Sequence, residues 1–273
     1  MLRRKRGLIG VFITSSFVLI AILAPYIAPY DPYKLVGPPF SPPSEKFILG
    51  TNDLGQDVFS ELLYGTRISL LISLIAGICS TFIAAAFGIL SGYYQKVGSF
   101  FTGLMDIFLL IPFVPFVILL AANLGPGLLT VLLAISILTW PAGARTIRSQ
   151  TISVKNKEFM ESIKALGASD GYTIMRYILP NVASLIYANA ILRIVDAILL
   201  EAALSFLGLG DPTQKSWGMM LYFAQQRTAF STGAWWWFIP PGLCITLLAL
   251  GFNLLASVLE DVLNPRSKYI TWR

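Results

Sequence analysis

Six apolar segments, each long enough to cross a lipid bilayer, recur along this chain of 273 residues. About 20 helical residues match the ~30 Å hydrocarbon core of a membrane. Because that core offers no water to backbone groups, each segment is expected to be a helix that satisfies its own hydrogen bonds. Hydrophobic residues make up 56 % of the chain and charged residues 12 %, about half the charged share of a soluble domain. The sequence therefore predicts an all-α integral membrane protein with six transmembrane helices. The expected spans are 8–28, 68–92, 100–122, 128–144, 181–207 and 235–259.

The chain begins with a basic stretch, LRRKR, ahead of the first apolar run. Such a start is also typical of a cleaved signal peptide, but this run is longer than a usual signal core. We therefore expect residues 1–29 to form a basic cytoplasmic N-terminus and an uncleaved first span. The proline-rich segment 30–67 is too polar and too broken for a span, and is expected to be extracytoplasmic. The remainder divides into a core of five spans at 68–264 and a cytoplasmic tail at 265–273.

The distribution of lysine and arginine sets the expected orientation. With a cytoplasmic N-terminus, only five of the 20 basic residues lie in outside segments, Arg193 lies within a span, and the other 14 lie inside. The positive-inside rule then places both termini and the loop 145–180 in the cytoplasm. This placement accounts for the net charge of +6 without nucleic acid as a partner. The five outside residues are Lys34, Lys46, Arg67, Lys215 and Arg227.

The cytoplasmic loop 145–180 is large for a simple connector between two spans. Its middle contains four apolar residues at helical spacing, which form one stripe on a helix over 157–166. Gly167 follows, where a helix commonly ends in a left-handed residue, and Ser169 or Asp170 can cap a second short helix. Periodicity alone allows two interpretations, a helix lying on the bilayer surface or one docking in the groove of a soluble partner. The stripe consists of Phe159, Met160, Ile163 and Leu166.

The segment 158–180 resembles the EAA loop of ABC importer permeases. In that family the loop forms the coupling helix that seats on the ATPase subunit. The positions that match the motif are Glu161, Gly167, Leu179 and Pro180, and the departures from it are Ser162, Ile163 and Tyr177. The resemblance therefore implies that the loop carries ATPase coupling. The residues implied in coupling are Phe159, Met160, Glu161, Ile163, Leu166 and Gly167.

Three further stretches, at 49–69, 204–220 and 252–266, resemble the dipeptide/oligopeptide/nickel class of these permeases, and in particular the C-type member of a permease pair. This resemblance implies a type I ABC importer bundle in a prokaryotic cytoplasmic membrane. It implies a second permease subunit, two ATPase subunits and an extracytoplasmic binding protein as partners. ATP and Mg are expected on the ATPases, with no cofactor bound by this chain. Peptides are the expected cargo, and nickel chelates and oligosaccharides are the alternatives.

Four charged residues fall within the expected spans, where a charge at a helix centre costs about 2.5–3.5 kcal/mol. Arg193 and Asp196 are three positions apart, so they can meet on one helical face. The simplest interpretation is a pair facing the bundle interior, and the functional alternative is a polar lining of the translocation path. Pro112 and Pro115 are expected to kink the third span. The four charged residues are Asp106, Arg193, Asp196 and Glu201.

Other classes of function have less support in the sequence. The chain has no phosphate-binding loop of the G-x-x-x-x-G-K type, so it is expected to be a transport subunit whose fuel another protein hydrolyses. It has no histidine, and Cys79 and Cys244 lie in apolar spans, which disfavours haem, iron–sulfur and metal sites. Asp53 and Asp57 allow a cation site, but turn and cap chemistry explains them more simply. An ion-driven secondary transporter is the main alternative, and it would be expected to show embedded carboxylates and an internal repeat.

Overall fold

The computed structural model describes residues 2–263 and, within that range, the side chains of 5–94 and 96–259. Regular structure in the described residues is helical, apart from one isolated bridge between Thr51 and Asp57. The expected tail at 265–273 lies outside the described residues. In chain order the helices are α1 (Leu2–Ile27), α2 (Val58–Tyr93), α3 (Gln95–Leu110), α4 (Phe113–Leu124), α5 (Leu128–Lys155), α6 (Glu158–Ala165), α7 (Asp170–Thr173), the π-helix η1 (Ile174–Ile178), α8 (Leu179–Phe206), α9 (Trp217–Gln226), α10 (Ala229–Thr232) and α11 (Trp235–Leu263).

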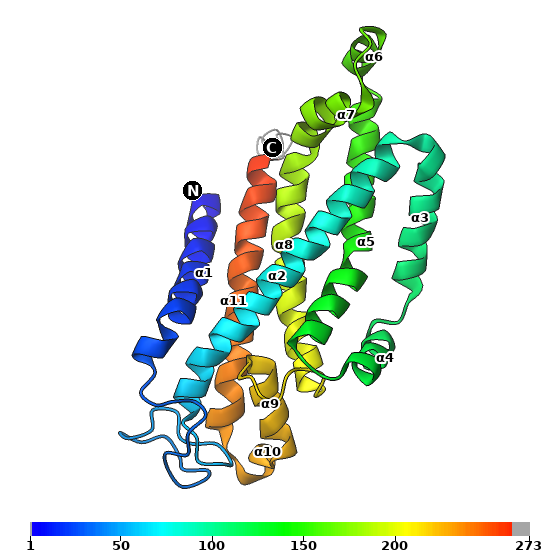
Figure 1. Cartoon of the computed structure of the whole chain (residues 1–273). Coiled ribbons are helices and arrows are strands. Elements are labelled where there is room, and N and C mark those ends of the chain that lie inside the picture. Colours follow the sequence, from blue (N-terminus) through cyan, green and yellow to red (C-terminus); the bar gives the residue numbers. More distant parts are fainter. Residues whose placement is uncertain (1, 264–273) are drawn as a thin grey trace.

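Five stretches of helix are long and apolar enough to cross a membrane, and the bent pair α3 and α4 makes six if it counts as one span. The long helices run side by side as one bundle (Figure 1). Within it, α2 packs against α1, α5 and α8, while α11 packs against α1 and α8. These helices confirm the prediction of an all-α membrane protein.

The third expected span is broken in the middle. The two arms, α3 and α4, meet at an angle of 86°. Ile111 between them is extended, with φ −67° and ψ 122°, as expected for a residue that precedes proline. The kink predicted at Pro112 is therefore confirmed. Pro115 lies in the first turn of α4, where the helix needs no hydrogen bond from its nitrogen, and it causes no further break.

The second span begins earlier than expected, at Val58 rather than at 68. The Asp57 carboxylate accepts a hydrogen bond from the Ser60 amide at 2.8 Å, and this cap starts the helix. The polar residues that follow do not prevent helix formation, because Glu61 is buried in a polar network described below. The segment 30–67, predicted to be extracytoplasmic, therefore ends at Asp57 in the structure.

The loop predicted to be cytoplasmic is also shorter than the expected 145–180. Helix α5 continues to Lys155, and the helical chain resumes at Asp170 and runs through α7, η1 and α8 to Phe206. Pro180 does not interrupt this stretch because it lies in the first turn of α8, where proline is tolerated. The loop is thereby reduced to α6 and its two short connections.

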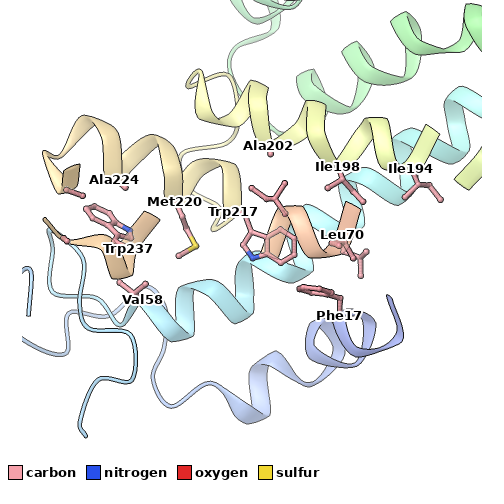
Figure 2. Packing of buried hydrophobic residues seen from close by; sticks show 14 residues of the cluster. Phe17, Val58, Leu70, Ile194, Ile198, Ala202, Trp217, Met220, Ala224 and Trp237 are labelled. Atoms are coloured by element: carbon pink, nitrogen blue, oxygen red, sulfur yellow. The ribbon is translucent and has the colours of Figure 1, made fainter. Parts of the chain in front are cut away.

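A buried cluster holds α9 against the long helices (Figure 2). Trp217 is fully buried and packs edge-on against Phe17 of α1, with ring centroids 5.6 Å apart. Its indole N–H donates to the Leu62 carbonyl at 3.1 Å. Gly65 makes room for the ring, since a Cβ there would lie 2.9 Å from the indole. The short helix α9 is thus part of the core.

The two ends of the bundle carry different structures. The N-terminal end of α1, the C-terminal end of α11 and the α6 hairpin lie at one end (Figure 1). Helices α9 and α10 and the coil at 28–57 lie at the other, which is called the outer end after its predicted orientation. The loop predicted to be cytoplasmic and the segment predicted to be extracytoplasmic are therefore at opposite ends.

Candidate coupling hairpin, span charges and outer pocket

The α6 hairpin projects from its end of the bundle, beyond the long helices (Figure 1). The helix ends through Gly167, which has φ +81°, a conformation that glycine adopts without steric cost. The amide of Gly167 donates to the Lys164 carbonyl at 3.0 Å, and that of Ala168 donates to the Ile163 carbonyl at 3.3 Å, which is the Schellman pattern. Ser169 then caps α7. The predicted helix–glycine–helix hairpin is confirmed.

The apolar stripe of α6 divides between two environments. Met160 is 1 % exposed and belongs to the core cluster at this end of the bundle. Leu166 is 88 % exposed and Phe159 is 40 % exposed, while Ile163 is half-buried beside a surface hollow that Leu166 also lines. Met160 therefore holds the hairpin to its own chain rather than facing a partner. Phe159 and Leu166, with the exposed Glu161 and Gly167, remain predicted contacts.

The root of the hairpin is tied to α2 by contacts that the sequence did not predict. The Tyr93 hydroxyl donates to Asp170 Oδ1 at 2.7 Å. The Lys155 amine donates to the Tyr93 carbonyl at 2.8 Å. The amines of Lys155 and Lys164 lie 5.6 and 5.5 Å from the centroid of the Tyr93 ring, within the range of cation–π attraction. This single tyrosine at the end of α2 thus contacts α5, α6 and α7.

The charged residues expected within the spans are found in separate contacts. Arg193 Nη1 lies 3.0 Å from Asp196 Oδ2 on α8, as predicted, and also donates to the Thr139 carbonyl at 3.3 Å. Asp106 on α3 pairs with Arg145 on α5. The sequence did not indicate this second pair, because its members are 39 positions apart. Pairing reduces the cost of placing charges within a membrane.

Glu201 makes a third, separate contact. Its side chain is buried, and its Oε1 accepts a hydrogen bond from Ser205 Oγ at 2.9 Å, one turn along α8. A serine donor of this kind satisfies part of a buried carboxyl group. The four charged residues predicted within the spans therefore lie in three separate places.

A polar network missed by sequence reasoning lies at the opposite end. The Lys215 amine donates to Gln56 Oε1 at 2.8 Å and to Glu61 Oε1 at 2.5 Å. The Asn52 amide donates to the same two oxygens, each at 2.9 Å. The side chains of Glu61 and Lys215 are 2 % and 16 % exposed, so this pair is buried and neutralised. It joins the coil at 28–57 to the segment before α9.

A cavity of about 370 Å³ adjoins this network, between the coil, α9 and the outer end of α11. Met219, Met220 and Phe223 supply apolar walls. On the polar side, Asp53 Oδ2 lies 3.6 Å from Arg227 Nε. Burial raises the pKa of Asp53, and the positive charge of Arg227 offsets part of that increase.

The two outer carboxylates that the sequence offered as a cation site have other roles. Asp57 caps α2, and Asp53 pairs with Arg227. Among the residues whose side chains are described, no group of three or more His, Cys, Asp or Glu is placed to hold a metal ion. Turn and cap chemistry therefore accounts for Asp57, as expected.

The sequence that forms this bundle and its projecting hairpin matches a known protein family. Residues 61–269 match the family described as binding-protein-dependent transport system inner membrane component. This chain belongs to that family. Residues 1–51 match the N-terminal transmembrane domain of oligopeptide transport permease C. The resemblance drawn from the EAA loop is confirmed, and the protein is a multi-pass permease subunit of an ABC importer.

Curated relatives align with nearly the whole permease. The dipeptide transport system permease protein DppC of Alkalihalophilus pseudofirmus is 36 % identical, over 97 % of this chain and 88 % of that protein. The di/tripeptide transport system permease protein DppC of Pseudomonas aeruginosa is 35 % identical, over 97 % and 89 % respectively. These relatives are named as transport permeases, which agrees with the prediction of a transport subunit rather than an enzyme.

A solved structure gives the same result for the fold. A chain from the inward-facing MetNI methionine ABC transporter superposes with a TM-score of 0.61, covering 75 % of this permease and 96 % of that chain. At 15 % identity the similarity concerns the fold alone. It confirms the expected type I importer bundle.

Proposed function

We propose that this permease is the C-type subunit of a peptide importer and pairs with a second permease subunit in a prokaryotic inner membrane. Its proposed cargo is a short peptide delivered by an extracytoplasmic binding protein. Two separate ATPase subunits, which bind ATP and Mg, would drive the cycle. The relatives named as dipeptide and di/tripeptide permeases support the cargo, and the N-terminal match to permease C supports the subunit type.

The observation that carries the proposal is the position of α6. It projects beyond the bundle (Figure 1), and Leu166 at its C-terminal end is 88 % exposed. An exposed apolar face on a short helix fits the groove of a partner. The hairpin lies at the same end as the N-terminal end of α1, which begins with the basic stretch LRRKR. The positive-inside rule assigns that end to the cytoplasm, where an ATPase would be found.

Movement of the ATPases would reach the spans through contacts of the hairpin. Met160 links α6 to the core, and Asp170 links α7 to the end of α2. From α7 the helical chain continues without a gap through η1 into α8. Closure of two ATPases on ATP would therefore shift α2 and α8 together. This arrangement supports an alternating-access mechanism driven from the hairpin.

Cross-linking tests the docking and the orientation together. In a variant whose native cysteines, Cys79 and Cys244, are replaced, Leu166→Cys should form a cross-link to an ATPase subunit in membranes. Leu35→Cys, 70 % exposed on the outer coil, is the matched control and should form none. Cross-linking from Leu35 instead of Leu166 would refute the proposed topology.

Transport tests the cargo and the energy source. Proteoliposomes holding the complete transporter and its binding protein should take up a tritiated dipeptide when ATP is supplied on the hairpin side. An ion gradient without ATP should not drive uptake. Uptake driven by the gradient would favour a secondary transporter. Competition by a nickel chelate or an oligosaccharide, but not by peptides, would replace the proposed cargo.

A further inference from the structure

One residue that lines the outer cavity, Trp237, carries a buried donor that no group satisfies. Among the described residues, Trp237 Nε1 has no hydrogen-bond partner, although the side chain is only 1 % exposed. The indoles of the buried Trp217 and the half-buried Trp236 are satisfied, since Trp217 donates to the Leu62 carbonyl and Trp236 donates to the Thr51 carbonyl at 3.2 Å. A buried tryptophan N–H usually finds a partner. Trp237 lines the cavity and lies beside Met220 in Figure 2.

The cavity also holds an ion pair that is only partly engaged. Asp53 Oδ2 and Arg227 Nε are 3.6 Å apart, and the Arg227 side chain is 59 % exposed. A guanidinium group has five N–H donors and binds a carboxylate through two of them. Arg227 therefore has donors to spare, while the side chain of Asp53, 15 % exposed, is held at the cavity wall.

The charge next to this pair is already neutralised. Lys215 lines the cavity as well, but its amine is engaged by Glu61 and Gln56. The charged groups left for a ligand are therefore one anion and one cation. The lining adds the Trp237 donor, the polar side chains of Tyr33, Thr213 and Gln214, and an apolar wall. The volume of about 370 Å³ is at the lower end of small-molecule sites, which span about 300–1,000 Å³.

We propose that this cavity is an extracytoplasmic binding site for a short zwitterionic peptide. Arg227 receives the peptide carboxylate, Asp53 the ammonium group, and Trp237 Nε1 donates to the peptide carbonyl. An apolar side chain packs against Met220 and Phe223. Binding replaces the ion pair between Asp53 and Arg227 with two new ion pairs to the peptide. No charge is therefore left unpaired. The proposal rests on the proposed function, because a peptide importer brings short peptides to this face.

Direct binding of tritiated Ala-Phe to the assembled transporter, without its binding protein, tests this site. Trp237→Phe keeps an aromatic ring and removes the donor, so it should weaken binding roughly fivefold, the effect of one net hydrogen bond. Arg227→Gln should weaken binding by roughly tenfold or more, because hydrogen bonds to charged groups are stronger. The matched controls are Trp235→Phe and Arg67→Gln, which change exposed residues outside the cavity and should leave binding unchanged.

The possible outcomes distinguish failure of the proposed binding site from failure of the proposed function. Equal binding of acetylated and amidated Ala-Phe would overturn the zwitterionic assignment. Absence of direct binding, while ATP-driven uptake of Ala-Phe with the binding protein continues, would overturn the site and leave the proposed function standing. Direct binding without any ATP-driven peptide uptake would instead refute the proposed function. Arg227→Gln alters a surface side chain, so it remains informative if Trp237→Phe fails to assemble.

Discussion

The Tyr93 hydroxyl donates a hydrogen bond to Asp170 Oδ1 at 2.7 Å, across 77 positions of sequence. Tyr93 is the last residue of α2 and Asp170 is the first residue of α7. The bond therefore connects the end of α2 directly to the root of the projecting hairpin. Since Lys155 also donates to the Tyr93 carbonyl, the ends of α2 and α5 and the start of α7 meet at this residue.

Replacing this tyrosine should uncouple the hairpin from α2. Tyr93→Phe keeps the ring beneath Lys155 and Lys164 and removes only the hydroxyl, so the loss of folding stability should be about 1 kcal/mol. Peptide uptake should fall several-fold while ATP hydrolysis continues, because the ATPases still dock on α6. The ratio of peptide transported to ATP hydrolysed in proteoliposomes measures the effect. Tyr187→Phe, at a side chain 64 % exposed, is the control, and an unchanged ratio for Tyr93→Phe would contradict the coupling role.

Two glycines of the hairpin offer a matched comparison. A Cβ added at Gly167 or at Gly171 would meet nothing within 4 Å, but only Gly167 has a positive φ. Gly167→Ala should therefore distort the end of α6 at a cost of about 1–2 kcal/mol and reduce uptake, whereas Gly171→Ala should leave uptake unchanged. Gly167→Asp should abolish uptake and stimulated ATP hydrolysis, while the subunits still copurify. Equal uptake by the two alanine variants would show that the left-handed turn is not required.

The span pattern and the hairpin could be predicted because they depend on local sequence. Apolar runs of bilayer length identified the spans, and Gly167 after a helical stripe identified the turn. Arg193 and Asp196 could be paired because they are three residues apart on one helix. The break at Pro112 followed from the missing N–H of proline.

What the sequence left undetermined depends on contacts between distant residues. The second span was placed ten residues too late because Glu61 made the region look too polar, and its partner Lys215 is 154 positions away. Likewise Met160 was grouped with the docking stripe, since helical periodicity does not distinguish burial in the protein's own core from burial in a partner. The outer cavity gave no local signal, because it forms only where the coil, α9 and α11 meet.

Asp53 should make the stability of the outer end depend on pH. Burial raises the pKa of Asp53 above its ordinary value of 3.8. At pH values between 3.8 and the raised pKa, the folded state therefore holds a proton that the unfolded state has lost. The contribution of this group to stability therefore falls as the pH rises through that window. Asp53→Asn should flatten this part of the profile, measured as Tm in detergent from acid to neutral pH. Asp31→Asn, at a more exposed carboxylate of the same coil, is the control, and an unchanged slope for Asp53→Asn would contradict the assignment.

The pair formed by Asp106 and Arg145 should hold α3 to the bundle. Helix α3 packs against α2 and α5, and the 86° bend at Pro112 prevents α4 from extending it as a straight span. Asp106→Asn and Arg145→Gln should each lower Tm and the yield of assembled transporter. Each leaves one half-exposed charge without its partner at membrane depth, at a cost of up to about 3 kcal/mol. The double variant should lose less than the sum of the single losses, because the two residues interact.

Exchanging the two residues gives the stricter test of this pair. In the variant Asp106→Arg with Arg145→Asp the opposite charges are kept, so much of the lost Tm should return. Asp31 and Lys34, an exposed pair on the outer coil with 3.7 Å between their charged atoms, provide the comparison. Neutralising either of them should change stability by about 1 kcal/mol or less. Additive losses in the double variant, with no recovery on exchange, would show that Asp106 and Arg145 act independently and that packing alone positions α3.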